Sequence, residues 1–425
     1  MNGRRAVITG IGVVAPGEPG TKAFWDLLTS GRTATRTITF FDPEPFRSRM
    51  AAECDFDPAR AGLSPQEVRR MDRTVQLAVV SAREALADSG LDTDAGDPAR
   101  TAVSMGSACG CTMGLEREYL VVSDGGRLWE VDPAYAVPHL YGYHVPSTLA
   151  SEVAWAARAE GPSALVSTGC TSGLDAVGHG SRLIEEGSAD VVVAGASDAP
   201  ISPISVACFD AIRATSPRNH DPGGASRPFD RDRQGFVLGE GAAVLVLEEA
   251  DHARRRRAHV YAELAGYASR ANATHMTGLQ PHGWEMAEAI TAALAHARLD
   301  PTDVDYVNAH GSGTKQNDVH ETNAFKRALG HHAHDVPVSS LKSMLGHSLG
   351  AIGALELAAC ALAVRHGVVP PTANLHTPDP ACDLDYVPLE ARSRRVDAAL
   401  SVGSGFGGFQ TAVLLTALGA PGGRR

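Results

Sequence analysis

The chain has 425 residues, of which 44% are hydrophobic and 20% charged, and its formal net charge is -11. This length favours two core-forming units or one large α/β unit. The negative charge argues against sequence-independent nucleic-acid binding, which requires a basic surface. The N-terminus MNGRRAVITG has no apolar h-region, and we find no apolar run of membrane-spanning length. We therefore expect a cytoplasmic protein that binds neither nucleic acid nor a membrane.

The first half of the chain alternates short β-branched runs with helical patterns. Its predicted strands are 4–14, 99–107, 162–170, 189–198 and 241–249, and its predicted helices are 73–90 and 171–187. The strand 162–170 ends at a cysteine, so it is expected to deliver Cys170 to a turn.

The second half repeats this alternation after the charged connector 250–257, whose arginines Arg254–Arg257 indicate a solvated helix end or, as the sharper alternative, a patch that docks an acidic protein. The predicted strands are 258–268, 303–310, 336–342 and a glycine-rich pair within 398–418, and the predicted helices are 285–297, 320–330 and 351–367. Such alternation predicts an α/β architecture with mostly parallel strands. The chain reads as two related halves that divide near residue 250, with Cys170 as the reactive residue of the first and His310 of the second.

Seven cysteines are scattered over the chain, at positions 54, 109, 111, 170, 208, 360 and 382. Their odd number and wide spacing favour reduced thiols over a disulfide framework. Cys109 and Cys111 form a close pair, but zinc sites need four ligands and no second pair exists, so we predict no metal. The segment Gly10–Ala15 fits a dinucleotide-binding pattern, yet the prolines that follow it cannot begin the helix such a site requires, so we expect no nicotinamide cofactor.

The stretch STGCTSG places Cys170 where a strand stops and a helix begins. Amide N–H groups and the dipole at a helix N-terminus favour a thiolate, so we expect the thiol pKa to fall below its usual ~8.5. The same amides can hold the oxygen of a thioester as it becomes tetrahedral. The small neighbours Gly169, Ser172 and Gly173 favour access over a buried structural role, and Cys170 is therefore the candidate nucleophile.

Two histidines occupy similar turns in the second half of the chain. His310 follows a predicted strand in NAHGSGT, and His347 precedes the long apolar helix in KSMLGH. Neutral imidazoles can donate N–H bonds to an oxyanion or enolate and can move protons. With Cys170 they form a candidate catalytic set.

The pentapeptide GHSLG also fits the G-x-S-x-G elbow that presents the serine of α/β-hydrolases and acyltransferases. Ser348 is therefore an alternative nucleophile. The chain beyond it offers only His366 and His376 as histidine partners, and neither lies in a sequence pattern that indicates a catalytic role. We expect Ser348 instead to cap the following helix.

Cys170, His310 and His347, in this order and with these surroundings, resemble the β-ketoacyl synthase family of the thiolase superfamily. The resemblance extends from VITGIGVVAPG to VGSGFGGFQ and includes SRPFD, GFVLGEG and NAHG. The chain is similar, more narrowly, to the ketosynthase-alpha subunit of type II aromatic polyketide synthases. The segments that carry this similarity are STGCTSGLDAVG, CFDAIRATS, HMTGL, NAHGSGTKQND and PPTANL. The sister subunit, the chain-length factor, typically has glutamine at the nucleophile position, so Cys170 places this chain on the catalytic side.

The resemblance implies a thiolase-like fold in which two related halves form a layered αβαβα arrangement. The halves would be residues 1–253 and 254–425, together one ketosynthase domain of about 2–417. It also implies a decarboxylative Claisen condensation with no bound cofactor, in which an acyl carrier protein presents substrates on its phosphopantetheine arm. Expected partners are that carrier protein and a chain-length factor in a heterodimer, in a pathway of the antibiotic or pigment type.

Residue roles follow from the same resemblance. Cys170 would carry the growing chain, and His310 and His347 would donate to the enolate of malonyl-carrier protein. Phe406 matches a gating phenylalanine, and its N–H would complete an oxyanion site with the N–H of Cys170. Lys342 resembles the lysine that orders the histidines, and Asp318 and Glu321 match acidic positions behind His310.

Alternatives remain at this point. A fatty-acid β-ketoacyl-carrier-protein synthase shares the same motifs, and a serine acyltransferase or hydrolase would use Ser348. Thiolases share the fold but need a second active-site cysteine, and GSGFGGF offers none.

Overall fold

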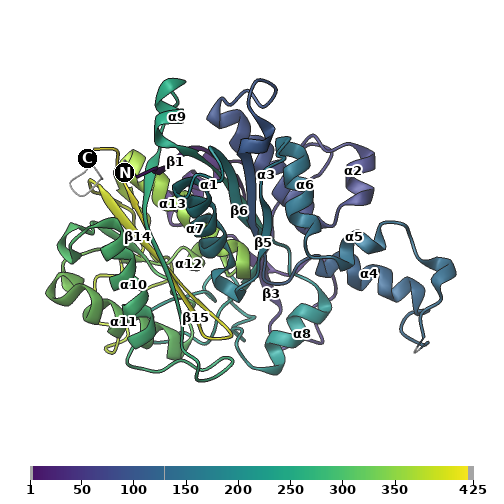
Figure 1. Cartoon of the computed structure of the whole chain (residues 1–425). Helices are drawn as coiled ribbons and strands as arrows, with labels where there is room; N and C mark the ends of the chain where they lie inside the picture. The colour runs from purple at the N-terminus through teal and green to yellow at the C-terminus, as the bar shows by residue number, and fades with distance from the viewer. Residues whose placement is uncertain (1–2, 129, 420–425) are drawn as a thin grey trace.

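The computed structural model in Figure 1 describes residues 3–128 and 130–419, so the outermost ends of the two predicted halves lie outside the described residues. Within these residues one mixed sheet of ten strands has the order β11-β10-β14-β15-β9-β1-β8-β6-β4-β5. Its strands are β1 (Ala6–Val14), β4 (Thr101–Gly106), β5 (Ser163–Val166), β6 (Val191–Asp198), β8 (Gly241–Glu249), β9 (Ala262–Ala271), β10 (Tyr306–Asn308), β11 (Val338–Ser339), β14 (Ala398–Gly405) and β15 (Phe409–Thr416).

The sheet consists of two five-stranded units with the same topology. Numbered in chain order within each unit, the strands lie in the spatial order 1-5-4-2-3 in both. In each unit the pairs 1-5 and 5-4 are antiparallel and the pairs 4-2 and 2-3 are parallel. The two units join where β1 pairs antiparallel with β9. The chain is therefore internally repeated in structure, as the alternation in its two halves suggested.

The prediction of mostly parallel strands is wrong, because the centre of the sheet, from β14 to β6, is antiparallel throughout. The turn between β14 and β15 spans only Phe406–Gly408, and so short a connection returns the chain antiparallel. In the first unit a long excursion replaces the helix that would give a parallel crossover between β6 and β8.

Helices cover both faces of each unit and fill the space between them (Figure 1). The helices are α1 (Thr21–Ser30), α2 (Pro65–Arg70), α3 (Arg73–Ser89), α4 (Thr112–Val122), α5 (Leu140–His144), α6 (Thr148–Ala157), α7 (Ser172–Glu185), α8 (Pro203–Ala211), α9 (Ala250–Arg255), α10 (Trp284–Ala297), α11 (Lys315–Leu329), α12 (Lys342–Leu345) and α13 (Ile352–His366). The short strands β2 (Thr35–Thr37), β3 (Met50–Ala52) and β7 (Leu238–Gly239) form a small sheet, and β12 (Val368–Val369) pairs with β13 (Arg392–Ser393).

Three apolar clusters define the layers. One lies between the units and contains α7 and α13 with strands of both. A second packs α10 and α11 on the outer face of the second unit, and a third packs α3 and α6 on the outer face of the first. The order of layers is thus αβαβα, and the predicted α/β fold class with two related halves is confirmed.

The central helices approach each other closely because glycine lines their contact. A Cβ at Gly173 would lie 2.5 Å from the backbone N of Ala354, and one at Gly353 would lie 2.7 Å from the backbone N of Leu174. No side chain fits at either position. This contact brings together the N-terminal ends of α7 and α13, where Cys170 and His347 lie.

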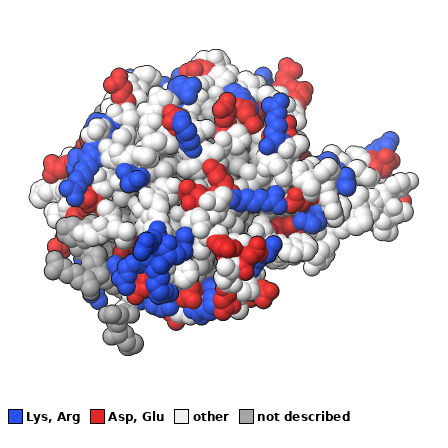
Figure 2. All heavy atoms as spheres, turned by 90° about the horizontal axis from the view of Figure 1, so that it is seen from above, with Lys and Arg blue, Asp and Glu red and all other residues white. Residues whose placement is uncertain are grey.

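The segment 250–257 forms the short helix α9 and a turn. Arg256 pairs with the buried Glu248, and Arg254 pairs with Asp251 at 3.1 Å. Figure 2, which views the molecule from above, shows one compact group of basic side chains on this face besides scattered acidic and basic ones. The pairing within α9 fits a solvated helix end.

The expectation that no apolar run is long enough to span a membrane is also wrong. Leu349–His366 has that length and a mean hydropathy of 1.4, but 83% of it is buried within the protein. It contains α13, and burial between the two five-stranded units explains an apolar helix as well as a membrane does.

Candidate active site

The turn that carries Cys170 lies between β5 and α7. The sequence predicts a strand that ends at Cys170. The observed strand β5 ends at Val166, four residues earlier. Cys170 lies in a single 3-10 turn, Gly169–Thr171, which runs directly into α7. Gly169 has a φ of +61°, and a Cβ there would lie 3.0 Å from the carbonyl oxygen of Phe406. Glycine is therefore needed both for the turn and for its close approach to the 406 loop.

His310 follows β10 in a turn held by a buried carboxylate. Glu321, from the second turn of α11, accepts the backbone N–H groups of His310 and Gly311, the latter at 2.7 Å. Gly311 has a φ of +41° and packs against Ser340, where a Cβ would lie 2.4 Å from the serine Cβ. These contacts fix the direction in which the imidazole leaves the strand.

His347 is held through its backbone by β7 and the residue before it. Its N–H donates to the carbonyl of Val237 at 2.7 Å, and its carbonyl accepts from Gly239 at 3.0 Å. The ring of Phe236 packs edge-on against the imidazole, with centroids 5.2 Å apart. The predicted segment GFVLGEG therefore supports His347 directly.

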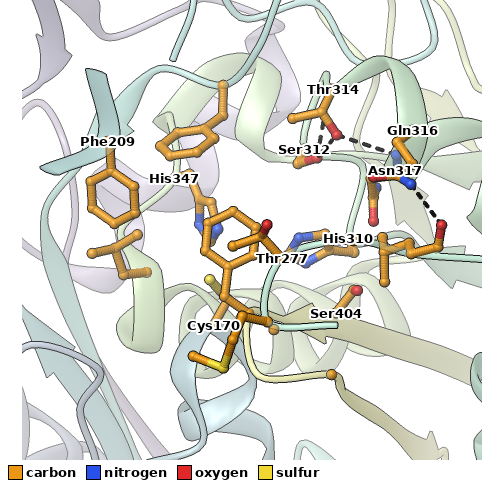
Figure 3. Close-up of a pocket in the computed structure, with 18 residues that line it drawn as sticks. Cys170, Phe209, Thr277, His310, Ser312, Thr314, Gln316, Asn317, His347 and Ser404 are labelled. Carbon is orange, nitrogen blue, oxygen red and sulfur yellow. Dashed lines mark hydrogen bonds between the residues drawn. The ribbon is translucent and has the colours of Figure 1, made fainter. Parts of the chain in front are cut away.

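Cys170, His310 and His347 line one pocket (Figure 3). The two imidazoles are nearly perpendicular, with centroids 5.4 Å apart. The pocket holds about 550 Å³ of space, its open mouth included. Its apolar lining consists of Phe209, Phe236, Met276, Leu279, Leu349 and Phe406, and its polar lining includes Thr277, Ser312, Thr314, Gln316, Asn317 and Ser404.

Phe406 closes one side of this pocket. It lies in the turn between β14 and β15, and its backbone N–H lowers the pKa of the Cys170 thiol. Gly407 and Gly408 follow with φ values of +95° and +89°. The predicted neighbourhood of Phe406 and Cys170 is thus observed, and the flanking glycines permit backbone conformations that other residues rarely adopt.

The expected fall in the thiol pKa of Cys170 is not observed. Burial raises this pKa to about 11, against the charge of Lys342 and the N–H of Phe406, which both lower it. Desolvation disfavours the thiolate more than the helix N-terminus favours it. The resting cysteine is therefore a thiol at neutral pH.

Both histidines are neutral at neutral pH. Burial, followed by the charge of Lys342, lowers the pKa of His310 and of His347 well below the usual range. The Nδ1 atoms of both rings are buried and have no hydrogen-bond partner among the residues that the structure describes. Neutral imidazoles can serve as N–H donors, as the sequence analysis expects.

Lys342 lies fully buried behind the histidines and does not line the pocket. Its ammonium donates to Glu356 Oε1 at 2.5 Å. Burial raises the pKa of Glu356 to about 7, although the lysine acts in the opposite direction. The pair holds a positive charge beneath both imidazoles.

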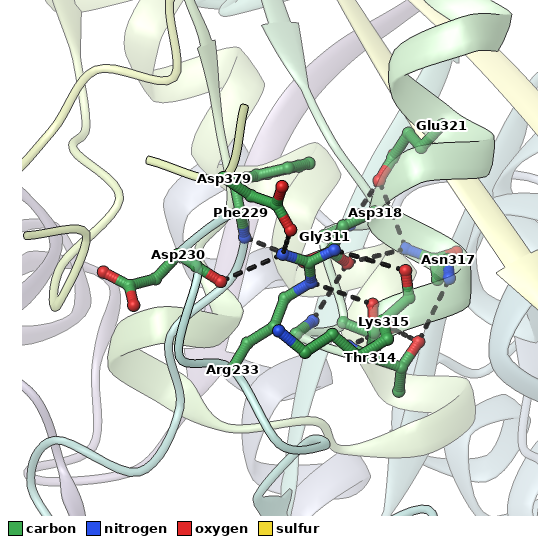
Figure 4. Close-up of polar contacts among 12 residues, drawn as sticks. Phe229, Asp230, Arg233, Gly311, Thr314, Lys315, Asn317, Asp318, Glu321 and Asp379 are labelled. Atoms are coloured by element: carbon green, nitrogen blue, oxygen red, sulfur yellow. Dashed lines mark hydrogen bonds and ion pairs between the residues drawn. The ribbon is translucent and has the colours of Figure 1, made fainter. Parts of the chain in front are cut away.

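Asp318 and Glu321 lie behind His310, and Figure 4 shows their contacts. Asp318 accepts the N–H groups of Phe229 at 2.8 Å and Gly313 at 3.2 Å, and it pairs with Arg233 at 3.1 Å. Arg233 is itself buried and also pairs with Asp379 at 2.6 Å. These groups anchor the turn that follows His310 and do not reach the pocket.

Ser348 does not occupy a nucleophile elbow. The residues before it form α12 and a glycine turn, whereas an elbow needs a strand. Its side chain is buried, lies outside the pocket lining and has no hydrogen-bond partner. The expected N-cap bond is also absent, although Ser348 occupies the N-cap position of the turn Leu349–Ala351.

Glu356 and Arg233 were not predicted from the sequence. Glu356 is the one carboxylate in the apolar run of α13, and that isolation was a usable signal. The pocket walls Phe209 and Phe236 lie in CFDAIRATS and GFVLGEG, two segments that carry the family resemblance, but the sequence predicts neither phenylalanine as a site residue. In the described residues no cluster of three or more potential metal ligands occurs.

Comparison with known proteins identifies the chain. The family description "Beta-ketoacyl synthase, N-terminal domain" matches residues 3–253, and "Beta-ketoacyl synthase, C-terminal domain" matches residues 261–376. The oxytetracycline polyketide putative β-ketoacyl synthase 1 of Streptomyces rimosus is 67% identical, with 97% of each chain covered. The tetracenomycin polyketide synthase ketoacyl synthase alpha subunit of Streptomyces glaucescens is 68% identical, again with 97% of each chain covered.

Solved structures agree with this assignment. A type II acyl-carrier protein in complex with its ketosynthase bound to a hexaketide includes a chain with a TM-score of 0.92 and 38% identity, and the match covers 98% of this chain and 100% of that one. The ishigamide ketosynthase/chain length factor gives a TM-score of 0.89 and 34% identity, with 98% and 100% covered. The predicted family and enzyme class are confirmed: the chain belongs to the β-ketoacyl synthase family and, within it, to the ketosynthase-alpha subunits of type II polyketide synthases.

Proposed function

We propose that this chain performs the decarboxylative condensation of aromatic polyketide synthesis, with Cys170 as nucleophile and His310 and His347 as donors to the enolate. One observation carries the assignment of roles: a thiol and two neutral imidazoles line the same pocket, together with Phe406. Each step below needs only these groups.

In the first step Cys170 takes an acyl group from the phosphopantetheine arm of an acyl carrier protein. The cysteine sulfur bonds to the acyl carbon, the pantetheine C–S bond breaks, and the thiol proton leaves with the pantetheine sulfur. The thioester oxygen lies between the N–H groups of Cys170 and Phe406 as it gains charge. Because the pKa of the thiol is about 11, deprotonation is coupled to attack and no standing thiolate is required.

In the second step malonyl-carrier protein loses CO₂. The electron pair of the broken C–C bond forms an enolate, and the N–H groups of His310 and His347 donate to its oxygen. A neutral donor suits this task, since an imidazolium would transfer its proton to the enolate and quench it. Burial keeps both rings neutral, and the charge of the buried Lys342 adds to this effect.

In the third step the enolate carbon attacks the Cys170 thioester, and the new C–C bond forms as the C–S bond to cysteine breaks. The cysteine leaves as a thiolate, which takes up a proton from water and becomes the resting thiol again. The same two backbone N–H groups hold the tetrahedral oxygen. Lys342, Glu321 and Asp318 position the histidines and touch no reacting atom. Within this scheme the chain needs no bound cofactor.

The partners are part of the proposal. The solved relatives include a ketosynthase with its acyl carrier protein and a ketosynthase/chain length factor pair, which supports a carrier protein and a chain-length factor as partners here. We also propose the boundary of the two halves at residues 253 and 254, and a cytoplasmic location. All seven cysteines are free thiols, which fits a reducing compartment.

Two substitutions test the roles. In the full chain with carrier protein and chain-length factor, Cys170→Ala is expected to reduce condensation by more than about 10³-fold. Ser348→Ala is expected to keep the rate within about twofold. Product formation from malonyl-carrier protein, followed by mass spectrometry, reports both. Condensation by Cys170→Ala at the native rate, together with loss in Ser348→Ala, would overturn the assignment.

A further inference from the structure

A buried carboxylate lies one helical turn beyond Cys170 and belongs to none of the steps above. Asp175, in the first turn of α7, is 4% exposed and does not line the pocket. We propose that Asp175 is a positioning residue that fixes the Cys170 turn against the strand that carries the Phe406 loop. The proposal rests on the function proposed above and adds a residue to it.

Two of the contacts of Asp175 lie on either side of the nucleophile. Its Oδ2 accepts the hydroxyl of Thr168 at 2.5 Å and that of Thr171 at 2.8 Å. Thr168 precedes Gly169-Cys170, and Thr171 follows Cys170 directly. One carboxylate oxygen therefore closes the turn from both ends.

The other oxygen reaches the second half of the chain. Asp175 Oδ1 accepts the hydroxyl of Thr411 on β15 at 2.8 Å and that of Tyr267 on β9 at 3.1 Å. Thr411 lies five residues after Phe406 on the strand that leaves the 406 loop. The carboxylate thus links the sulfur-bearing turn to the strand that sets the Phe406 N–H.

The number of hydroxyl donors around Asp175 matches the number of acceptor sites that a carboxylate offers. An ionised carboxylate offers about four lone-pair sites, and four hydroxyl groups occupy them. Within the described residues no lysine, arginine or histidine forms an ion pair with Asp175. A buried carboxylate without a cation is tolerated only when hydrogen bonds satisfy it. Losing one oxygen removes an acceptor that two hydroxyls share, although Thr171 also reaches the carbonyl of Thr168 and Thr411 also reaches the hydroxyl of Ser269.

The geometry required at Cys170 explains why such a link matters. The sulfur must lie within bonding reach of the acyl carbon while the N–H groups of Cys170 and Phe406 point at the oxygen of that acyl group. These two donors belong to different halves of the chain, so their spacing depends on contacts between the halves. Asp175 supplies two such bonds, to Tyr267 and Thr411, and it binds the Cys170 turn through two more, whereas it bonds to neither His310 nor His347 within the described residues. Its loss should therefore impair chemistry at Cys170 and spare decarboxylation.

Asp175→Asn tests this prediction. It keeps the shape of the side chain but replaces one acceptor oxygen by a donor. We expect the rate of acyl transfer onto Cys170 to fall by about 10²-fold, because small displacements of reacting groups have effects of this size. The rate at which malonyl-carrier protein is decarboxylated should stay within about threefold of the native rate, and the KM for malonyl-carrier protein should stay within the same range. Intact-mass spectrometry follows the acyl-enzyme, and CO₂ release follows decarboxylation.

Matched variants separate positioning from general stability. Asp305 accepts the N–H groups of Asp397 and Ala398 at the end of β10 away from His310, and Asp305→Asn is expected to leave acyl transfer within about twofold. Thr171→Val removes a single hydroxyl and is expected to lower acyl transfer by about tenfold, which keeps the test available if Asp175→Asn does not fold.

The outcomes are distinct from those that test the function itself. Acyl transfer by Asp175→Asn within about twofold of the native rate would overturn the proposal while leaving Cys170 as nucleophile. A parallel fall of acyl transfer and decarboxylation would also overturn it, because that result means general disruption. A selective fall in acyl transfer supports it.

Discussion

The two halves of this chain build the same five-stranded unit, yet they hold their reactive residues in different ways. In each unit the third strand leads toward a central helix. β5 leads through a turn into Cys170 and α7, and β11 leads through α12 into His347 and α13. The topological counterpart of Cys170 is therefore His347. His310, which the sequence pairs with Cys170 as the reactive residue of the second half, instead follows the second strand of its unit.

Hydroxyl groups hold the Cys170 turn, whereas charged groups hold the histidine turns. Around Cys170, threonine and serine hydroxyls bond to Asp175 and to the backbone of the turn. Beneath His310 and His347 lie the ion pairs Lys342–Glu356 and Arg233–Asp318. The same fold thus serves two tasks, presenting a thiol in one half and neutral imidazoles in the other. The buried charge of Lys342, which together with burial keeps the imidazoles neutral, lies in the same half as they do.

Removing the buried charge should give the largest effect. Lys342→Met leaves Glu356 buried without a partner, and loss of one partner of such a pair typically lowers the free energy of unfolding by about 3–5 kcal/mol. Glu356 has a raised pKa in the folded protein, so its unfavourable contribution grows as the pH rises through about 7, and the loss should be larger at high pH. Urea unfolding at several pH values measures this dependence.

The double variant Lys342→Met with Glu356→Gln is the control. It removes both charges and should recover most of the stability, but not the condensation rate, because the histidines still lack the lysine. Recovery of the rate would show that Lys342 acts through stability alone.

Substituting the histidines should come next in size. His310→Ala or His347→Ala removes one donor to the enolate, and loss of such a donor typically lowers the rate by about 10²–10³-fold. Acyl transfer onto Cys170 should persist in both variants, since its oxygen is held by backbone N–H groups. CO₂ release and acyl-enzyme mass separate the two activities. Equal loss of both would contradict the division of roles between the halves.

Opening the contact between the central helices should have a moderate effect. A methyl group at Gly353 would meet the backbone N of Leu174 at 2.7 Å and push α7 from α13. Overpacking of this kind typically lowers stability by about 1–3 kcal/mol, and the shift should separate Cys170 from His347. Thermal unfolding and condensation rate of Gly353→Ala test this, with Gly330→Ala as a control, since space at Gly330 is open and only its φ of +60° is strained.

The smallest expected effect is that of pH on decarboxylation. The pKa of each histidine lies well below 6.5, so both stay neutral and CO₂ release by Cys170→Ala should change by less than about twofold from pH 6.5 to 8. Lys342→Met raises both histidine pKa values and should move the acid limb of the profile to higher pH. A half-maximal rate near the ordinary histidine pKa of about 6.5 in the parent protein would contradict neutral, buried donors.

Several features were within reach of the sequence. The order of motifs around Cys170, His310 and His347 identified the family, and hydrophobic periodicity located α3, α7, α10 and α13. These signals are local, because a turn that requires glycine or an apolar helix face that must be buried is encoded by residues close together in the sequence. The repeat of the two halves was visible as alternation, but not its antiparallel centre.

Other features depend on residues distant in the chain. Burial reversed the expected shift of the Cys170 pKa, because desolvation depends on the packing of segments such as the Phe406 loop. Ser348 matched a nucleophile motif yet lies behind the pocket, since helix α12 precedes it where an elbow needs a strand. Glu356, Arg233 and Asp175 gained their roles only when folding brought Lys342, Asp318 and Thr411 to them. The sequence by itself thus determined which groups could react, and the tertiary structure decided their charge states and partners, because those depend on burial and on distances between the two halves.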